Sequence, residues 1–201
     1  MPPDFLVSLA QPRPDPGGGA AAAYGARVGL ALVEKVVRLE RRRKHPGPLP
    51  ADGWDQAMAQ VQRLAARLTE LQEADVEAYF HLIQTLAAGE AGPLRQAVAE
   101  ALQCPFDIMA AALAGLELAG WTGQGCRPHL LADLQVAAAG LLGAMAGAYH
   151  IALANLPLMA DPFSRQEWVA RLAAAEQQGW QVYQRVRQEL RRREAGYVSG
   201  S

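Results

Sequence analysis

Two aspartates are the first residues of the chain to consider for proton transfer. Asp133 follows a loop and lies in the first turns of the most apolar segment. A carboxylate there is costly unless it is paired, stabilises a helix start or takes part in catalysis. Asp75 lies on a long helical segment, where surface acids are ordinary, and its position alone favours no role. An acid–base function therefore remains open for Asp133 beside a purely structural one.

Three consecutive glycines, Gly17, Gly18 and Gly19, stand directly before an alanine-rich helical segment. Glycine has no side-chain bulk, so a ligand could lie directly against backbone amides at the positive end of the helix dipole. A tight turn that docks the helix is the other interpretation. The segment is not a nucleotide-binding fingerprint, because no strand precedes it and no P-loop Lys or Ser/Thr follows.

Further polar groups lie at the ends of the predicted helices. Arg38, Arg42 and Lys44 close the helix that the glycines open, where cations favour the dipole and could also attract an anionic substrate tail. His129 and Asn155 flank the apolar segment. Asn155 is either a satisfied buried amide or a ligand contact, and both interpretations stay open.

Composition excludes several classes of protein. The net charge of −1 argues against a nucleic-acid-binding surface over the whole chain, and an arginine-rich stretch at 185–193 is best explained as a solvated helix face. The histidines and acids lack zinc-ligand spacing, so we expect no metal, and no cofactor motif is present. The two cysteines fit reduced thiols. Without a signal peptide or a convincing membrane span, we expect a cytoplasmic protein.

The pattern of apolar residues predicts an all-α fold, an up-and-down helical bundle with a central apolar helix. Residues 1–195 form a single domain in this prediction, and 196–201 form a mobile tail. A break or kink is expected at Pro105, and Ser164 with Glu167 fits a capping box. The predicted helices cover residues 4–10, 20–43, 54–88, 93–103, 105–121, 129–156 and 164–194.

Several motifs together resemble the cyclodeaminase/cyclohydrolase family, which acts on one-carbon adducts of tetrahydrofolate. They extend over residues 5–190, and the Pro14–Gly19 segment is the most specific. The residues that carry the resemblance are Phe5–Ala10, Pro14–Ala23, Gly29–Val33, Asp75–Tyr79, Pro105, Asp133–Ala139 and Gly147–Asn155.

The resemblance implies an all-helical homodimer that needs no redox cofactor. It implies hydrolysis of 5,10-methenyltetrahydrofolate to the 10-formyl compound, or closure of 5-formiminotetrahydrofolate with loss of ammonia. We expect hydrolysis, because no formiminotransferase domain accompanies the chain. Asp133 is the first candidate for the catalytic carboxylate and Asp75 the second. The glycines would bind the ligand, and the cluster from Arg38 to Lys44 would hold the glutamate carboxylates of the folate.

The sequence also departs from the family pattern. The loop Cys126–Asp133 lacks two asparagines and a serine that usually precede the aspartate, and His129 is a possible substitute for one of them. A non-catalytic or repurposed folate-binding protein is therefore an alternative to an enzyme.

Overall fold

The computed structural model describes residues 4–43 and 47–198, and all regular elements in these ranges are helical. This confirms the predicted all-α class. The helices are α1 (Phe5–Leu9), α2 (Gly18–Arg41), α3 (Ala51–Ala88), α4 (Ala91–Gly125), α5 (Leu131–Asn155) and α6 (Pro162–Val198), with 3-10 turns at Pro128–Leu130 and Leu156–Leu158.

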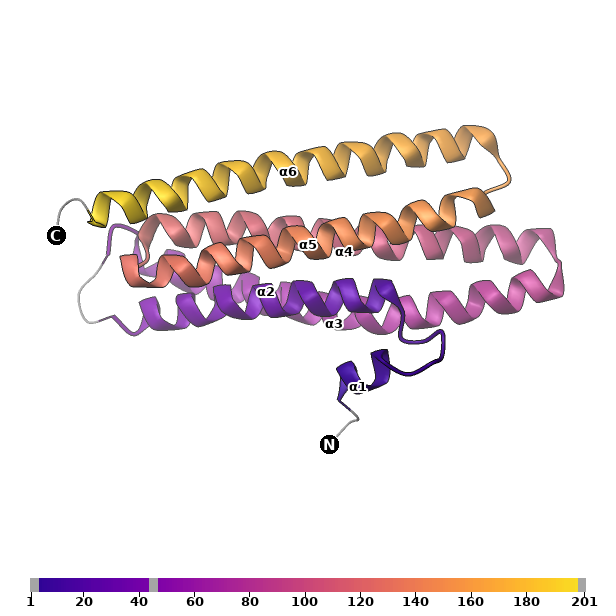
Figure 1. The fold of residues 1–201 in the computed structure, drawn as a ribbon, viewed down its shortest axis with the longest axis horizontal. Helices are drawn as coiled ribbons and strands as arrows, with labels where there is room; N and C mark the ends of the chain where they lie inside the picture. The colour runs from indigo at the N-terminus through magenta and orange to yellow at the C-terminus, as the bar shows by residue number, and fades with distance from the viewer. Residues whose placement is uncertain (1–3, 44–46, 199–201) are drawn as a thin grey trace.

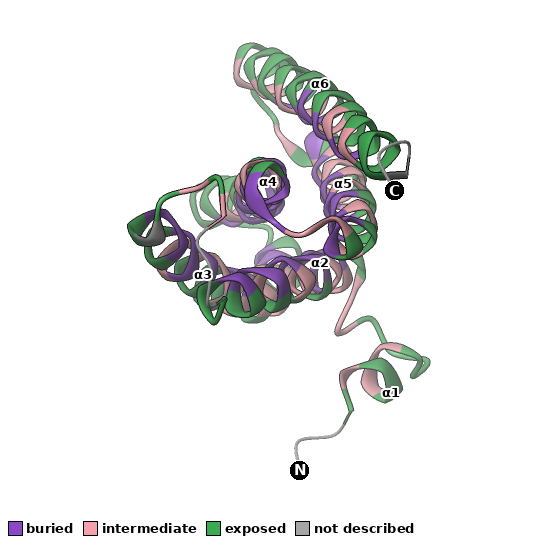
Figure 2. Ribbon diagram, turned by 90° about the vertical axis from the view of Figure 1, so that its left-hand side faces the viewer, coloured by how far each residue is buried: buried purple, intermediate pink, exposed green. Residues whose placement is uncertain are grey.

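The long helices run up and down beside one another, as Figure 1 shows. Helices α2, α3, α4 and α5 enclose the core, and α6 lies across α4 and α5 on the outside (Figure 2). The short helix α1 stands off the bundle and reaches it through Phe5, whose ring stacks on Tyr24 of α2 at 4.7 Å. The apolar helix α5 contacts α2, α4 and α6, as expected for a central helix.

By length and composition alone, the segments Ala91–Gly125 and Pro128–Leu158 could each cross a membrane. In the bundle, 56% of the most apolar window of the first segment is buried, which identifies α4 as a core helix. The corresponding window of the segment containing α5 is only 39% buried. Helix α5 therefore keeps apolar surface outside the core, while the expected cytoplasmic location stays a prediction.

Glycine allows α2 and α5 to approach closely. A Cβ atom added to Gly29 would meet the Cγ of Leu141 at 2.9 Å and the carbonyl oxygen of Ala137 at 3.1 Å. Across the same contact, a Cβ on Gly140 would lie 3.9 Å from the Cα of Gly29. The two backbones thus pack nearly against each other.

Of the break or kink predicted at Pro105, the break is wrong, because α4 continues through this residue to Gly125. Proline has no N–H to donate to the carbonyl four residues earlier, which is that of Ala101. The side-chain amide of Asn155 donates to this carbonyl instead, at 2.8 Å. A polar group on a neighbouring helix thus replaces the lost helical hydrogen bond.

Two other predicted boundaries differ from the structure. The capping box at Ser164 is wrong, because α6 begins at Pro162 and the Asp161 carboxylate accepts from the Ser164 amide at 2.9 Å. Its hydrogen bonds with Ser164 lower the pKa of Asp161. At the other end α6 continues to Val198, so 196–198 are helical rather than part of a tail, and 199–201 lie outside the described residues. No proline interrupts this end of the helix.

We expect Gly29→Ala to lower the free energy of unfolding by about 1–3 kcal/mol, because the new methyl group must displace the backbone of α5. Gly92→Ala is the control, since a Cβ there meets no atom within 4 Å. Chemical denaturation of both variants measures the difference. Equal stabilities would contradict the tight α2–α5 contact.

Candidate functional site

The glycine loop leads into the first turn of α2, where neighbouring side chains leave no room for a Cβ at Gly18 or Gly19. Gly17 is the N-cap residue and supplies no side chain to cap the helix. A Cβ on Gly18 would lie 2.7 Å from the flexible end of Ile151, whereas one on Gly19 would coincide with the Asp75 carboxylate. Position 19 therefore requires glycine because of the carboxylate and not because of its backbone angles.

Asp75 extends from α3 to the start of α2 and replaces the missing cap. Its Oδ2 accepts a hydrogen bond from the backbone N–H of Ala20 at 2.8 Å. Burial raises the pKa of Asp75, and the hydrogen bond from Ala20 only partly offsets this effect. A half-buried carboxyl group with a raised pKa at a helix N-terminus is suited to accept and return a proton.

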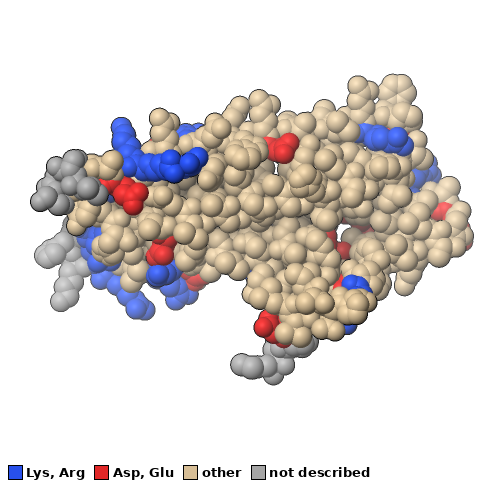
Figure 3. Space-filling view, in the orientation of Figure 1, with Lys and Arg blue, Asp and Glu red and all other residues tan. Residues whose placement is uncertain are grey.

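The glycines, Asp75 and Asn155 surround one cavity of about 250 Å³. Figure 3 shows the surface hollowed beside the N-terminal end of α2, with acidic atoms in the hollow. Four parts of the sequence thus meet: the loop before α2, the second half of α3, Ala101 of α4 and the end of α5. The complete lining is Pro14, Asp15, Gly17, Gly18, Gly19, Asp75, Val76, Ala78, Tyr79, Leu82, Ala101, Ile151, Ala154 and Asn155.

Asn155 has a structural task at this cavity, because its Nδ2 donates to the Ala101 carbonyl that Pro105 leaves without a helical partner. Both Ala101 and Asn155 line the cavity. Of the two interpretations of Asn155, the satisfied buried amide is therefore correct for its Nδ2. Among the described residues no partner is recorded for its Oδ1, which leaves this oxygen available to a ligand.

The remaining sequence-predicted residues do not join this cavity. Asp133 forms an ion pair with Lys35 at 2.8 Å and lies 22 residues before Asn155 on α5, or about 33 Å along the helix. Arg38 is exposed and pairs with Glu34 at 2.5 Å.

Arg42 and His129 are also exposed near the end where α2 finishes. Figure 3 shows basic side chains gathered at this end. Lys44 lies outside the described residues.

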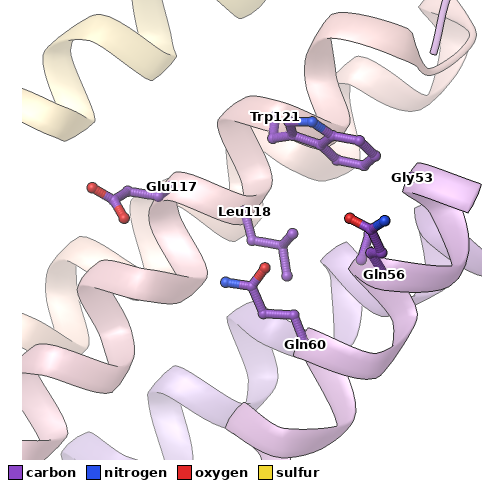
Figure 4. Close-up of a pocket in the computed structure, with 7 residues that line it drawn as sticks. Gly53, Gln56, Gln60, Glu117, Leu118 and Trp121 are labelled. Carbon is purple, nitrogen blue, oxygen red and sulfur yellow. The ribbon is translucent and has the colours of Figure 1, made fainter. Parts of the chain in front are cut away.

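Other cavities offer less chemistry. One of about 260 Å³ lies between α3 and α4, where Gln56 and Gln60 face Leu118 and Trp121, and the carboxylate of Glu117 points away (Figure 4). A larger one of about 490 Å³ has a mostly apolar lining, and its one carboxylate, Asp161, caps the start of α6. Among the described residues, no group of three His, Cys, Asp or Glu side chains could hold a metal ion.

Sequence reasoning did not select Asp15, Tyr79 or Ile151 as site residues, yet all three line the cavity. Tyr79 could have been found, because it lies one helical turn after Asp75 and shares its side of α3. No sequence signal marks Ile151, since it is one apolar residue in an apolar helix.

Comparison with known proteins gives the family. The family described as Formiminotransferase-cyclodeaminase matches residues 3–174, which is most of the chain. The chain belongs to this family. The family also includes methenyltetrahydrofolate cyclohydrolase-like proteins.

Individual relatives of this cyclodeaminase-type chain are distant. Formimidoyltransferase-cyclodeaminases of Mus musculus and Rattus norvegicus are each 29% identical over 180 residues, covering 81% of this chain and 32% of theirs. The chain thus spans about a third of the length of these relatives. A methenyltetrahydrofolate cyclohydrolase of Methylorubrum extorquens is 39% identical over 75 residues, which is 37% of this chain and 36% of that protein.

A solved structure has the same fold. The formiminotetrahydrofolate cyclodeaminase of Thermotoga maritima superposes with a TM-score of 0.88, covering 95% of this chain and 96% of the other. The sequence identity is 22%, so this likeness concerns the fold alone.

Replacing Asp75 by asparagine in this family member should change how stability depends on pH. The native pKa of Asp75 is raised, so its ionisation destabilises the folded state as the pH rises through that pKa. Asp75→Asn retains an acceptor for Ala20 and should be more stable than the parent protein at neutral pH. The advantage should vanish below about pH 3.9, where the unfolded carboxyl is also protonated. Denaturation at several pH values measures it, and a difference independent of pH would contradict the burial argument.

A double-mutant cycle tests the link between Asn155 and Pro105. We expect Asn155→Ala to cost about 1–3 kcal/mol, because the buried Ala101 carbonyl loses its donor. In a Pro105→Ala background the restored backbone N–H can serve that carbonyl, so the cost should fall by about 1 kcal/mol. Equal costs in both backgrounds, measured by urea unfolding, would show that the two residues act independently.

Proposed function

We propose that the chain catalyses closure of 5-formiminotetrahydrofolate to 5,10-methenyltetrahydrofolate with release of ammonia. The carrying observation is Asp75, a half-buried carboxyl group of raised pKa that faces a cavity beside the glycine loop. The cyclodeaminase activity is supported by relatives bearing that name, which match over 81% of the chain. The cyclohydrolase relative matches over only 37%, so hydrolysis, our first expectation from the sequence, becomes the second candidate.

In this proposal Asp75 moves one proton between two nitrogens. N10 of the folate attacks the carbon of the protonated formimino group, and the Asp75 carboxylate takes the N10 proton. The resulting carboxylic acid gives this proton to the former imino nitrogen, which leaves as ammonia with the electrons of the broken C–N bond. The cationic methenyl bridge remains. A pKa raised by burial helps the same group to act first as base and then as acid.

The glycines give the substrate access to the start of α2. With no side chains at positions 17 to 19, the folate can lie against the loop and close to Asp75. The Asn155 Oδ1 can accept a hydrogen bond from an amino group of the ligand. The roles of Asp75, Asn155 and the glycines in binding and catalysis are part of this proposal.

Hydrolysis would use the same carboxylate on the product of the first reaction. Asp75 would deprotonate a water molecule that adds to the methenyl carbon, and this proton would pass to N5 as the bond between N5 and the carbon breaks. The proton of the resulting hydroxyl group would leave to solvent as the formyl C=O forms. The formyl group would remain on N10. The cyclohydrolase relative, although it matches a shorter stretch, keeps this candidate open.

Two assays with the purified chain separate the activities. Cyclodeamination of 5-formiminotetrahydrofolate produces the near-ultraviolet absorbance of the methenyl product and releases one molecule of ammonia for each molecule of that product. Hydrolysis instead accelerates the loss of that absorbance from added 5,10-methenyltetrahydrofolate beyond its spontaneous rate. A protein inactive in both assays that still binds a folate adduct would be the repurposed binding protein, and the proposed activity would be wrong.

We expect Asp75→Asn to lower kcat at least about 100-fold, in keeping with the loss of a positioned acid–base group. Glu77→Gln is the matched control, because Glu77 is an exposed carboxylate two residues away on the same helix. The control should retain the kcat of the parent protein. If both variants retained it, Asp75 would not be the group that moves the proton.

We also infer that the chain is a homodimer, as its resemblance to the family implies, and that it is cytoplasmic, as expected from the sequence. The apolar surface that α5 leaves outside the core supports association.

A further inference from the structure

A second cavity lies next to the Asp75 cavity, at the end of the bundle where α4 begins and α5 finishes (Figure 1). On α4, Ala101 lines the Asp75 cavity and Val98 lines the second one. At the end of α5, Asn155 lines the first cavity, and Leu158 in the following 3-10 turn lines the second. Both pairs are only three residues apart, so the two cavities are neighbours.

One stripe of α4 extends along both cavities. Leu94, Val98 and Ala101 are four and three residues apart, which is the spacing of one helix face. Leu94 and Val98 line the second cavity, and Ala101 lines the first. A ligand that leaves the Asp75 cavity along this stripe therefore reaches the second cavity one helical turn later.

The Asp75 cavity is too small to enclose a whole folate. Its volume is about 250 Å³, below the roughly 300–1,000 Å³ of cavities that bind small molecules. The second cavity, of about 490 Å³, has room for the part of the folate that the first cannot hold. Its lining includes Leu94, Val98, Leu158 and Met159, which suit an aromatic ring.

Arg95 is the one basic residue in the lining of the second cavity. It is exposed, and no acid lies one helical turn away on α4, where positions 91, 92, 98 and 99 hold Ala, Gly, Val and Ala. Within residues 4–43 and 47–198 no ion pair is formed by Arg95. Lys35 and Arg38, by contrast, are paired with Asp133 and Glu34. The Arg95 guanidinium group is thus free to bind a carboxylate.

We propose that the second cavity binds the p-aminobenzoylglutamate tail of the folate and that Arg95 holds its carboxylates. This step rests on the proposed function, because it locates the rest of the same substrate. Arg95 lies six residues before Ala101, which is about 9 Å along α4. By ordinary bond lengths, N10 of a folate is about 10 Å from the α-carboxylate of its glutamate. A folate whose N10 lies beside Asp75 therefore brings this carboxylate within reach of the arginine.

Other cations of the chain fit the tail less well. Arg38 lies about 30 Å from Gly18 along α2. Arg13 directly precedes Pro14 at the Asp75 cavity but lines neither cavity, so it offers a charge without an apolar surface for the aminobenzoyl ring. The second cavity supplies both.

The one carboxylate in the lining of the second cavity does not oppose an anionic ligand strongly. Asp161 lies at the start of α6, where the backbone N–H and the hydroxyl of Ser164 both donate to its Oδ2. These hydrogen bonds and the positive end of the helix dipole offset its charge. The Arg95 guanidinium group remains without such partners.

Binding of a stable analogue tests the proposal without turnover. 5-Formyltetrahydrofolate carries an oxygen in place of the imino nitrogen, and 5-formyltetrahydropteroate is the same molecule without the glutamate. We expect Arg95→Gln to weaken binding of the folate about 10- to 100-fold, as for a lost hydrogen bond between charged groups, and to leave binding of the pteroate nearly unchanged. Arg63→Gln is the matched control, because Arg63 is an exposed arginine on α3 that lines neither cavity. Titration calorimetry measures these affinities.

The outcomes separate this proposal from the proposed activity. An Arg95→Gln variant that binds the folate as tightly as the parent protein would overturn the tail site, and so would a loss found in Arg13→Gln instead. A parent protein that binds no folate would overturn the tail site and the proposed activity together. Binding that depends on Arg95 without any turnover would support the tail site and reject the activity.

Filling the second cavity tests its role separately from the charge. Ala91 lines this cavity in the first turn of α4, whereas Ala110 is exposed on the same helix outside both cavities. We expect Ala91→Trp to weaken binding of 5-formyltetrahydrofolate about tenfold and Ala110→Trp to leave it unchanged, while circular dichroism of both stays helical. Equal affinities of the two variants would show that the tail does not enter the cavity.

A reactive analogue would report the position of the tail directly. Both native cysteines are buried, so Ala91→Cys and Arg42→Cys each provide one reactive thiol, at the second cavity and at the basic end of α2. A folate whose γ-carboxylate is extended by a bromoacetyl-bearing amine alkylates a nearby thiolate, which displaces bromide and forms a thioether. We expect rapid labelling of Ala91→Cys that excess 5-formyltetrahydrofolate suppresses. Faster labelling of Arg42→Cys would place the tail at the basic end and contradict the proposal.

Discussion

The near-contact of the α2 and α5 backbones is the constraint on which the rest of the molecule depends. Gly29 leaves room for Leu141 and Ala137, and the absence of a side chain there fixes how the two helices lie along each other. Since the first turn of α2 is rigidly connected to this contact, Gly18 comes to rest against Ile151 near the end of α5. The cavity forms where these two helix ends meet the middle of α3. A looser contact would separate the glycine loop from Asn155.

The polar groups at the cavity serve the fold and remain available for chemistry. Asp75 supplies the cap that Gly17 lacks, and Asn155 supplies the donor that Pro105 lacks. Each uses one atom for this purpose: Oδ2 in Asp75 and Nδ2 in Asn155. The other polar atom is fixed in place as a result, which is the kind of preorganisation that a catalytic group needs. The raised pKa of Asp75 follows from the same burial.

The sequence predicted the helical class and the order of the long helices, because helical periodicity is local and strong. It also marked the glycines, Asp75 and Asn155, but ranked Asp133 above Asp75. This ranking followed apolar surroundings in the sequence, whereas Asp75 is buried by the helices that pack on α3, which are α2 and α4 and lie elsewhere in the chain. The helix break at Pro105 was mispredicted for a similar reason. The donor that replaces the missing N–H is Asn155, which lies 50 residues later in the chain. The N-cap of α6 was placed three residues too late, at Ser164 instead of Asp161, because both residue types commonly cap helices.

The separation of the predicted binding residues along α2 has a physical meaning of its own. A straight helix of 24 residues cannot bring its first turn near its last, so Gly18 and Arg38 lie about 30 Å apart in one chain. Within one chain these cations therefore cannot contact a ligand that lies against the glycines. Asp75 and Asn155 lie beside the glycines because they come from other helices, whose packing brings residues remote in the sequence to the start of α2. The cavity thus gathers its polar groups across helices and not along one.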